Sequence, residues 1–259
     1  MDTHEAVTHG AEAGHTGGIH IALAAEKLGE FLGLPITNTL ITSWIVVALL
    51  LVLAWFIGRN VRLVPGKLQT LVEIVFVYIH DYISDTLESE KLAKRFFPLL
   101  VTIFLFVFTA NALEFTPGIG SLGFTHHGEF LPLFRSVNTD LNVTLALSII
   151  AFFVIQMTGI LTLGILKYGG KFVNFRSPMG FFIGIIELFS EIARLVSFSF
   201  RLFGNIFAGE VLILVVAFFV PYLLPVPLML FEVFVGFIQA AIFALLTLFF
   251  IKIAIAEPH

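Results

Sequence analysis

Cysteine is absent from the 259-residue chain, and charged residues are scarce. The lack of thiols excludes disulfides, thiolate metal sites and cysteine nucleophiles. Asp, Glu, Lys and Arg make up 12% of the sequence, about half of the roughly 25% that a soluble domain carries. The net charge of −4 gives no basic surface for nucleic acid. The chain is instead 58% hydrophobic with 31 phenylalanines, so its composition indicates an integral membrane protein.

The long apolar stretches predict an all-α membrane protein with about five membrane-embedded helices. Residues 1–35 are expected to form a polar tail with a short helix around Ile19–Leu32, and residues 36–259 to form the membrane domain. The irregular spacing of four histidines in the tail favours solvated chain over a metal site. The segments expected to be embedded are Asn38–Gly58, Phe96–Leu113, Leu141–Leu166, Pro178–Val220 and Leu228–Ala256.

Two further features shape this architecture. Lys67–Leu87 has apolar residues at helical spacing on one face and polar residues on another, which is typical of an amphipathic helix at the membrane surface. The last two apolar segments are longer than a span needs, because ~40 helical residues extend ~60 Å, twice the hydrocarbon thickness of about 30 Å. We expect them to form a long, strongly tilted hairpin whose turn lies at Pro221–Pro227, where three prolines interrupt the helices.

Lysine and arginine are distributed unevenly between the loops, which predicts the orientation of the chain. Basic residues concentrate in cytoplasmic loops. Placing the N-terminus outside and the C-terminus in the cytoplasm leaves only Lys27 and Arg135 on the outer side, while Arg194 and Arg201 lie within apolar segments. The ten residues then on the inner side are Arg59, Arg62, Lys67, Lys91, Lys94, Arg95, Lys167, Lys171, Arg176 and Lys252.

Arg201 is the most informative polar residue inside an apolar segment. A charge at the centre of a bilayer costs ~3 to more than ~10 kcal/mol, so a chain that keeps one usually has a use for it. Ser197, Arg201 and Asn205 recur at steps of four, and Gly204 and Ala208 lie beside that line. Because small residues let another helix approach closely, we expect Arg201 to lie on a face that a partner helix contacts.

The predicted hairpin brings further polar residues to matching depths. In an antiparallel pair that turns near residue 221, Arg201 would lie level with Gln239, and Glu210 would lie level with Glu232. Both carboxylates would then lie between the arginine and the outer surface, and Glu187 would lie between it and the inner surface. Acidic groups are thus expected on each side of a central cation, along one path through the membrane.

Simpler roles remain open for several other polar residues in the apolar segments. Arg194 either extends to the inner surface or pairs with Glu187 and Glu191, in which case these carboxylates are structural. Asn111 and Gln156 are expected to make ordinary hydrogen bonds between helices.

Five motifs resemble one protein family. The chain is similar, from about residue 36 to its end, to subunit a of the F-type ATP synthase membrane sector. The arginine motif and the downstream glutamine motif together carry most of the specificity. The motifs are RLFGNIFAGE at Arg201–Glu210, FIQAAIFALLTLFF at Phe237–Phe250, TANALEFTPG at Thr109–Gly118, VNTDLNVTLALS at Val137–Ser148 and PGKLQTLVE at Pro65–Glu73.

The resemblance implies a stator subunit, itself not an enzyme and without cofactor or metal, in the bacterial inner membrane. Its partners would be the c-ring, the peripheral stalk subunit b and the rest of the F-type ATP synthase, within the lipid bilayer. Two offset half-channels would carry protons to and from the ring carboxylates. Arg201 would separate the half-channels and Gln239 would support it; Asn205, Glu210 and Glu232 would line the outer one, and Glu187 and Ser197 would lie near the inner one.

The family often has glycine or histidine at the levels of Glu210 and Glu232, so the relay here would be wholly carboxylate, and which of the two passes the proton is open. A secondary cation/proton transporter is the alternative function, but it would usually show inverted repeats and broken helices, and the sequence shows neither. An intramembrane enzyme is disfavoured because no HExxH motif, Ser–His pair or nucleotide-binding loop is evident. The sequence leaves the choice between H⁺ and Na⁺ open, and we favour H⁺.

Overall fold

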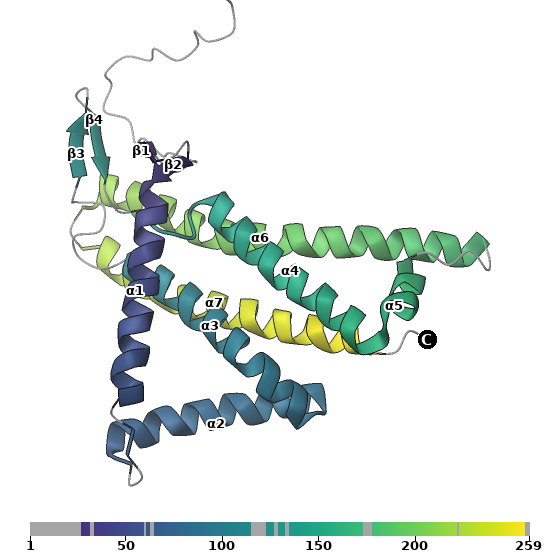
Figure 1. Cartoon of the computed structure of the whole chain (residues 1–259). Coiled ribbons are helices and arrows are strands. Elements are labelled where there is room, and N and C mark those ends of the chain that lie inside the picture. Colours follow the sequence, from purple (N-terminus) through teal and green to yellow (C-terminus); the bar gives the residue numbers. More distant parts are fainter. Residues whose placement is uncertain are drawn as a thin grey trace, which may run out of the picture.

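Five long helices dominate the computed structural model (Figure 1). It describes residues 27–31, 34–59, 61–62, 65–114, 123–126, 129–132, 135–172, 178–221 and 223–256. By length and composition these five helices can cross a membrane, which confirms the predicted all-α membrane protein. They are α1 (Asn38–Arg59), α3 (Glu90–Glu114), α4 (Leu141–Leu163), α6 (Pro178–Phe219) and α7 (Pro225–Ile255).

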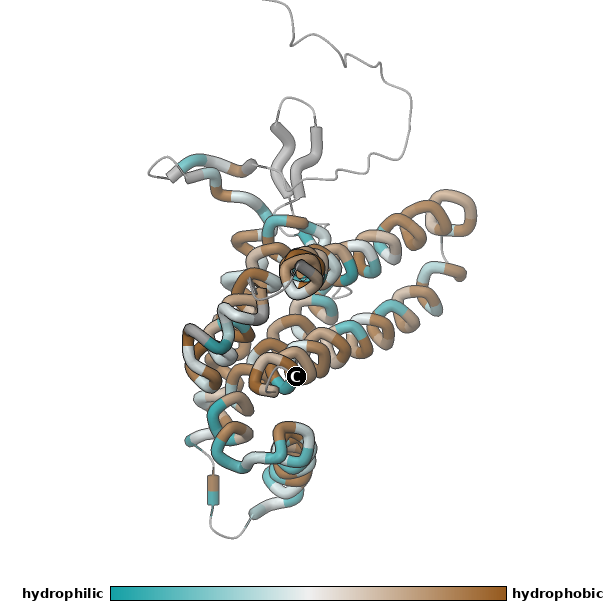
Figure 2. The backbone as a smooth tube through the Cα atoms, turned by 90° about the vertical axis from the view of Figure 1, so that its right-hand side faces the viewer, coloured by the Kyte–Doolittle hydropathy of each residue, from teal (hydrophilic) through white to brown (hydrophobic). Residues whose placement is uncertain are grey.

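Helix α2 (Lys67–Leu87) has the bounds that its amphipathic pattern predicts. It lies crosswise at the foot of α1 (Figure 1), and hydrophilic residues alternate with hydrophobic ones along it (Figure 2). Its buried residues Ile83 and Leu87 belong to one apolar cluster with Leu248 and Ile251 of α7. One face of α2 is therefore fixed to the helical bundle, as expected of a helix that lies at the membrane surface rather than across it.

Helices α6 and α7 form the predicted hairpin, and the chain reverses between Phe219 and Pro225, whereas the predicted turn spans Pro221–Pro227. Their 42 and 31 residues correspond to lengths of about 63 and 46 Å, well beyond the hydrocarbon thickness of about 30 Å. Both run crosswise to α1 in Figure 1, as expected of a strongly tilted hairpin. Helix α7 starts at Pro225, three residues before the predicted start, because proline is accommodated in the first turn of a helix.

The expected helix around Ile19–Leu32 is wrong where it can be compared. Strand β1 (Lys27–Phe31) pairs antiparallel with β2 (Leu34–Thr37), and residues 1–26 lie outside the described residues. Proline, isoleucine and threonine at the end of β2 favour extended backbone over helix, and they give β1 a partner. A second hairpin, β3 (Gly123–His126) with β4 (Glu129–Pro132), was not predicted.

The fourth apolar segment ends earlier than predicted. Helix α4 stops at Leu163 instead of Leu166 because Gly164 has φ +84°, a conformation that glycine adopts readily and that ends a helix. A short helix, α5 (Ile165–Phe172), follows and turns the chain toward α6. The ring of Tyr168 fills the space where Gly159 has no side chain, so this glycine lets α5 fold back onto α4.

The centre of the bundle is apolar and is built by α3, α4, α6 and α7. One cluster of buried side chains joins Val107, Ala151, Leu202 and Phe243, one from each of these helices. Many other large apolar residues are exposed, including Trp44, Trp55 and Phe219. Exposure on this scale is incompatible with a water-soluble monomer and indicates contact with lipid or partner subunits.

Candidate functional site

Arg201 lies on an open face of α6. Its side chain is exposed, and the guanidinium Nη2 donates to the Ser197 hydroxyl over 3.4 Å. Across the described ranges, no carboxylate comes within ion-pair distance of it. Gly204, one turn along the helix, has open space where a side chain would start. The predicted small-residue face around the arginine is therefore present, and the chain's own acidic groups leave it uncovered.

Gln239 is buried next to this face and bonds to Asn205 rather than to Arg201. The Asn205 amide Nδ2 donates to Gln239 Oε1 over 2.7 Å, which joins α6 to α7. The sequence predicts that Gln239 supports Arg201, whereas its side chain bonds to Asn205, one turn further along α6. The Gln239 Nε2 amide is buried and has no hydrogen-bond partner among the described residues.

Glu210 and Glu232 come to the same depth of the hairpin, as the sequence predicts. The buried Glu232 carboxylate packs directly against Gly209, the residue before Glu210, and fills the space that a side chain at 209 would need. Glu210 is half-buried, and its Oε2 atom is without a hydrogen-bond partner in the described part of the chain. The Glu232 carboxylate of α7 thus lies beside the residue of α6 that precedes Glu210, and both glutamates are at least partly shielded from solvent.

The acidic residues near the start of α6 are divided between two environments. Glu187 is half-buried, whereas Glu191 is buried and accepts from Arg194 Nη1 over 2.8 Å. The Arg194 guanidinium also stacks over Phe250, 4.1 Å from the ring centroid. Of the two roles left open for Arg194, the structure supports pairing within the chain.

A hydrogen-bonded network extends from Glu191 into α4 and α5. Gln156 donates to the Glu191 carboxylate over 2.9 Å and accepts from the Tyr168 hydroxyl, which confirms the interhelical bond expected of Gln156. Burial, together with the charge of Glu191, raises the pKa of Tyr168 to about 12. The tyrosine therefore stays protonated and acts as a fixed donor, and the network fastens three helices together.

The segment 135–140 is a feature that the sequence prediction missed. All six residues are buried although they form no helix. The Asp140 side chain accepts from the Asn142 backbone N–H over 2.9 Å at the start of α4 and from the Thr39 hydroxyl of α1 over 2.9 Å. The Asn-Thr-Asp run before an apolar stretch predicts the start of a helix. Nothing in this polar run predicts that its side chains are buried.

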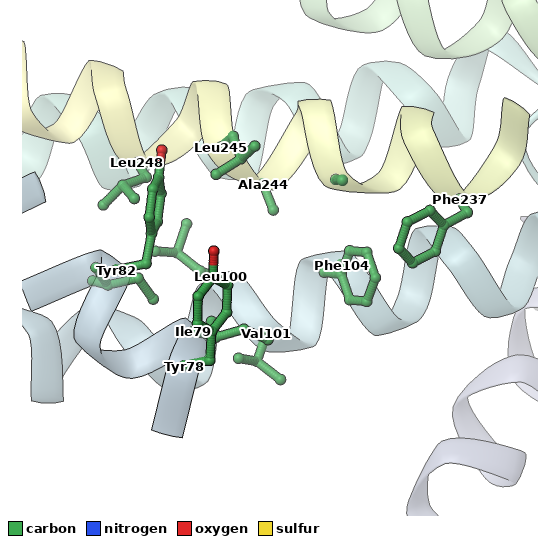
Figure 3. A pocket seen from close by; sticks show the side chains of 12 residues that line it. Tyr78, Ile79, Tyr82, Leu100, Val101, Phe104, Phe237, Ala244, Leu245 and Leu248 are labelled. Carbon is green, nitrogen blue, oxygen red and sulfur yellow. The ribbon is translucent and has the colours of Figure 1, made fainter. Parts of the chain in front are cut away.

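An apolar cavity of about 410 Å³ opens between α2, α3 and α7 (Figure 3). Tyr78 and Tyr82 of α2 line one side, and Phe104 and Phe237 lie toward the other end. No carboxylate, amide or basic side chain is among the residues that line it. None of the site residues predicted from the sequence lines the cavity, so the candidate site remains with the polar residues of α6 and α7.

Comparisons with known proteins identify one family. The family model described as "ATP synthase A chain" matches residues 40–252. The chain is 33% identical over 220 residues to "ATP synthase subunit a" of Geotalea daltonii, covering 84% of this chain and 87% of the relative. It is 32% identical over 245 residues to "ATP synthase subunit a 2" of Syntrophotalea carbinolica (93% and 94% covered). A relative from Campylobacter jejuni, "ATP synthase subunit a", is 34% identical over 206 residues (78% and 83%).

Proposed function

Because the chain belongs to the ATP synthase A chain family, we propose that Arg201 divides two proton half-channels beside a rotating ring of subunit c. The chain is a proton-translocating subunit of the ATP synthase membrane sector. The c-ring and the peripheral stalk subunit b are its proposed direct partners, and catalysis of ATP synthesis is assigned to other subunits. Residues from 36 onward form its membrane domain. The alternative of a secondary transporter is not favoured by the family assignment.

The observation that carries this proposal is the uncovered guanidinium of Arg201. The chain supplies it with one hydroxyl, from Ser197, which does not compensate a charge in an apolar segment. A carboxylate brought by a partner helix would do so, and each subunit of a c-ring carries one. Because arginine keeps its proton in any such environment, Arg201 can attract a deprotonated carboxylate but cannot pass protons from one half-channel to the other.

The remaining candidate residues fit on either side of this barrier. Toward the hairpin turn, Asn205 bonds to Gln239 and Glu232 packs against Gly209 at the α6–α7 contact. We assign these residues, except Gly209, together with Glu210 to the outer half-channel. Toward the start of α6, we assign Glu187 and Ser197 to the surroundings of the inner one. Unpaired buried amide and carboxylate atoms at Gln239 and Glu210 support the presence of water along the outer path.

We place the N-terminus outside and the C-terminus in the cytoplasm of a bacterium, with the chain in the inner membrane. The basic residues support this orientation, because six of them flank α2 and basic loops prefer the cytoplasmic side. The end of the hairpin where α6 meets α7 then faces outward, together with Glu210 and Glu232.

The test is coupled proton pumping by the complete ATP synthase in vesicles. Arg201→Ala is expected to abolish ATP-driven pumping while passive proton leak through the membrane sector persists, because nothing then separates the half-channels. Arg59→Ala is the matched control, since Arg59 is an exposed arginine at the end of α1 beside Trp55. Normal coupled pumping by Arg201→Ala vesicles would overturn the proposal.

A further inference from the structure

The apolar cavity between α2, α3 and α7 follows one face of α7. The residues of α7 that line it recur at helical spacing from Phe237 to Leu248, which places them on a single side of the helix. These two residues are eleven positions apart, so the wall that they limit extends for ~16 Å. Figure 3 shows Phe104 and Phe237 at one end of this wall and Tyr82 and Leu248 at the other. The cavity is therefore an elongated space.

Polar groups mark the end of the cavity near Leu248. Tyr78 and Tyr82 bring phenol hydroxyls to this part of the lining, and tyrosine is enriched where a membrane meets water. Lys252 follows Leu248 by four residues, so it continues the lining face of α7 by one turn. Its side chain is 43% exposed, and its ammonium donates to Glu88 over 3.0 Å. One end of the elongated space thus has hydroxyls and a cation, and the other has two aromatic rings.

The cavity opens to the exterior of the chain, because Tyr78, Phe237 and Leu245 line it and are nevertheless exposed. In a chain embedded in a bilayer, lipid or a helix of a partner subunit can reach such an opening. A helix with its side chains is 10–12 Å across and rises 5.4 Å per turn, so one turn occupies about 420–610 Å³. The cavity of about 410 Å³ therefore holds at most about one turn of helix. A flexible acyl chain, by contrast, needs only a narrow path.

The charge at the polar end favours an anionic lipid. Basic residues beside a membrane attract anionic headgroups, and Lys252 places an ammonium one turn beyond the apolar wall. Its ion pair with Glu88 is exposed. Because exposed ion pairs are weak, a phosphate group can take the place of the Glu88 carboxylate. The hydroxyls of Tyr78 and Tyr82 can donate to the ester oxygens that join a headgroup to its acyl chains.

We propose that this cavity binds an anionic phospholipid of the bilayer, with one acyl chain along α7 toward Phe104 and Phe237 and the phosphate beside Lys252. The acyl chain adds to the apolar contact that Ile83 and Leu87 of α2 make with α7. This lipid site is separate from the polar residues of α6 and α7 that we assign to proton transfer, and it does not depend on their function.

Photolabelling of the complete ATP synthase tests the acyl-chain site. The complex is reconstituted in phosphatidylcholine vesicles with a trace of phosphatidylglycerol that carries a photoreactive diazirine at the end of one acyl chain. Illumination is expected to label the chain near Phe104 and Phe237. Ala244→Phe narrows the cavity that Ala244 lines and should lower this labelling at least about fourfold, the effect of one methylene that no longer fits.

Ala54→Phe is the matched control for this labelling. It makes the same change on the exposed surface of α1, outside the cavity, and should leave the labelling near Phe104 and Phe237 at the wild-type level. An unlabelled cavity in the wild-type complex would overturn the proposal. Equal labelling of the Ala244→Phe and Ala54→Phe complexes would do the same.

Two substitutions at the polar end test the headgroup, and their expected effects have opposite signs. Competition by unlabelled phosphatidylglycerol and phosphatidylcholine measures the preference for the anionic lipid. Lys252→Gln should lower this preference about fivefold, the attraction of one basic residue near a membrane. Glu88→Gln should raise it, because the lysine no longer pairs with a carboxylate. Lys67→Gln, the same change at the exposed start of α2, should leave it unchanged.

This competition experiment also decides the matter if the Ala244→Phe complex does not assemble. Identical lipid preferences in the Lys252→Gln, Glu88→Gln and Lys67→Gln complexes would refute a phosphate site at Lys252. A photoreactive side chain introduced at the exposed lining residue Leu245 identifies the occupant directly. It is expected to capture phospholipid, and capture of another subunit of the complex in its place would show that the cavity is a protein contact and not a lipid site.

Discussion

Two arginines on α6, seven residues apart, occupy opposite environments. The Arg194 side chain is 14% exposed, pairs with Glu191 at 2.8 Å and stacks over Phe250. Arg201 is exposed, and its guanidinium donates one hydrogen bond of 3.4 Å to the Ser197 hydroxyl. The same residue type in the same helix is compensated within the chain in one case and left for a partner in the other. A charge in an apolar segment therefore marks function when the chain leaves it uncovered.

The difference follows from the neighbours of each arginine. Arg194 has a carboxylate three residues before it, and Gln156 of α4 holds that carboxylate in place. Arg201 has serine four residues before it and glycine and asparagine after it, and Asn205 is engaged with Gln239. Small or occupied neighbours cannot fold over the guanidinium, so its face stays free for a passing helix.

The largest expected effect comes from changing Arg201 to lysine, with the same change at Arg194 as the comparison. Arg201→Lys should lower ATP-driven pumping by about a hundredfold or more, as when a preorganised charge-stabilising group is lost. A lysine ammonium loses its proton when desolvated against an apolar surface, whereas a guanidinium does not. Arg194→Lys should pump within a few-fold of wild type, because the Glu191 pair can re-form. Proton uptake by vesicles at matched complex content measures both, and equal losses would show that the two sites do not differ in function.

The second prediction concerns the stability that the covered arginine provides. Removing one partner from a buried ion pair leaves an uncompensated charge and typically costs about 3–5 kcal/mol. Arg194→Leu should therefore destabilise the chain strongly, since the Glu191 side chain is only 4% exposed. The double variant Glu191→Leu/Arg194→Leu should recover part of the loss because no charge is left buried. Unfolding in detergent by heat or denaturant measures this, and a double variant less stable than Arg194→Leu would refute the account.

The arrangement of the helices could be predicted from the sequence more fully than their contacts. The bounds of α2 and, to within one residue, of α6 follow from periodicity, apolar length and proline positions, whereas α7 begins three residues before its predicted start. The level of Glu232 beside Gly209 follows from counting along an antiparallel hairpin, but the count does not specify side-chain partners, and Gln239 bonds to Asn205 rather than to Arg201. Helix α5 depends on the positive φ of Gly164, which interrupts a continuous apolar run that hydropathy alone assigns to one helix.

Burial of the 135–140 segment could not be predicted for a different reason. Its residues are mostly polar, and polar residues between two helices normally indicate an exposed loop. It is buried because Glu114, Asn111 and Thr39 from distant parts of the chain supply its hydrogen bonds. Such compensation is a property of tertiary structure, and single-sequence patterns do not record it.

Two glycines of α6 extend the comparison between an open and a covered face. A side chain at Gly209 would collide with the Glu232 carboxylate, whereas a Cβ at Gly204, near Arg201, would have none of the described residues within 4 Å. Gly209→Ala should destabilise the chain by about 1–3 kcal/mol, the usual effect of overpacking. Gly204→Ala should stabilise it by up to about 1 kcal/mol, because alanine favours helix. Thermal unfolding of the purified chain in detergent distinguishes them, and a destabilising Gly204→Ala would show that the face is covered.

The smallest expected effect tests whether pairing alone, without burial, stabilises the chain. Lys252 of α7 contacts Glu88 at 3.0 Å, and their side chains are 43% and 78% exposed. An exposed pair contributes ~0–1 kcal/mol, so Glu88→Gln should lower stability by less than ~1 kcal/mol, far less than Arg194→Leu.

Glu88 also ends α2 with φ +52°, a left-handed conformation that costs a non-glycine residue roughly 1–2 kcal/mol. Glu88→Gly removes the ion pair as Glu88→Gln does, but it also removes this backbone strain. The Glu88→Gly protein should therefore be at least as stable as wild type. Thermal unfolding of both variants in detergent decides the matter: if Glu88→Gln is as damaging as Arg194→Leu, pairing rather than burial accounts for the stability assigned to the covered arginine.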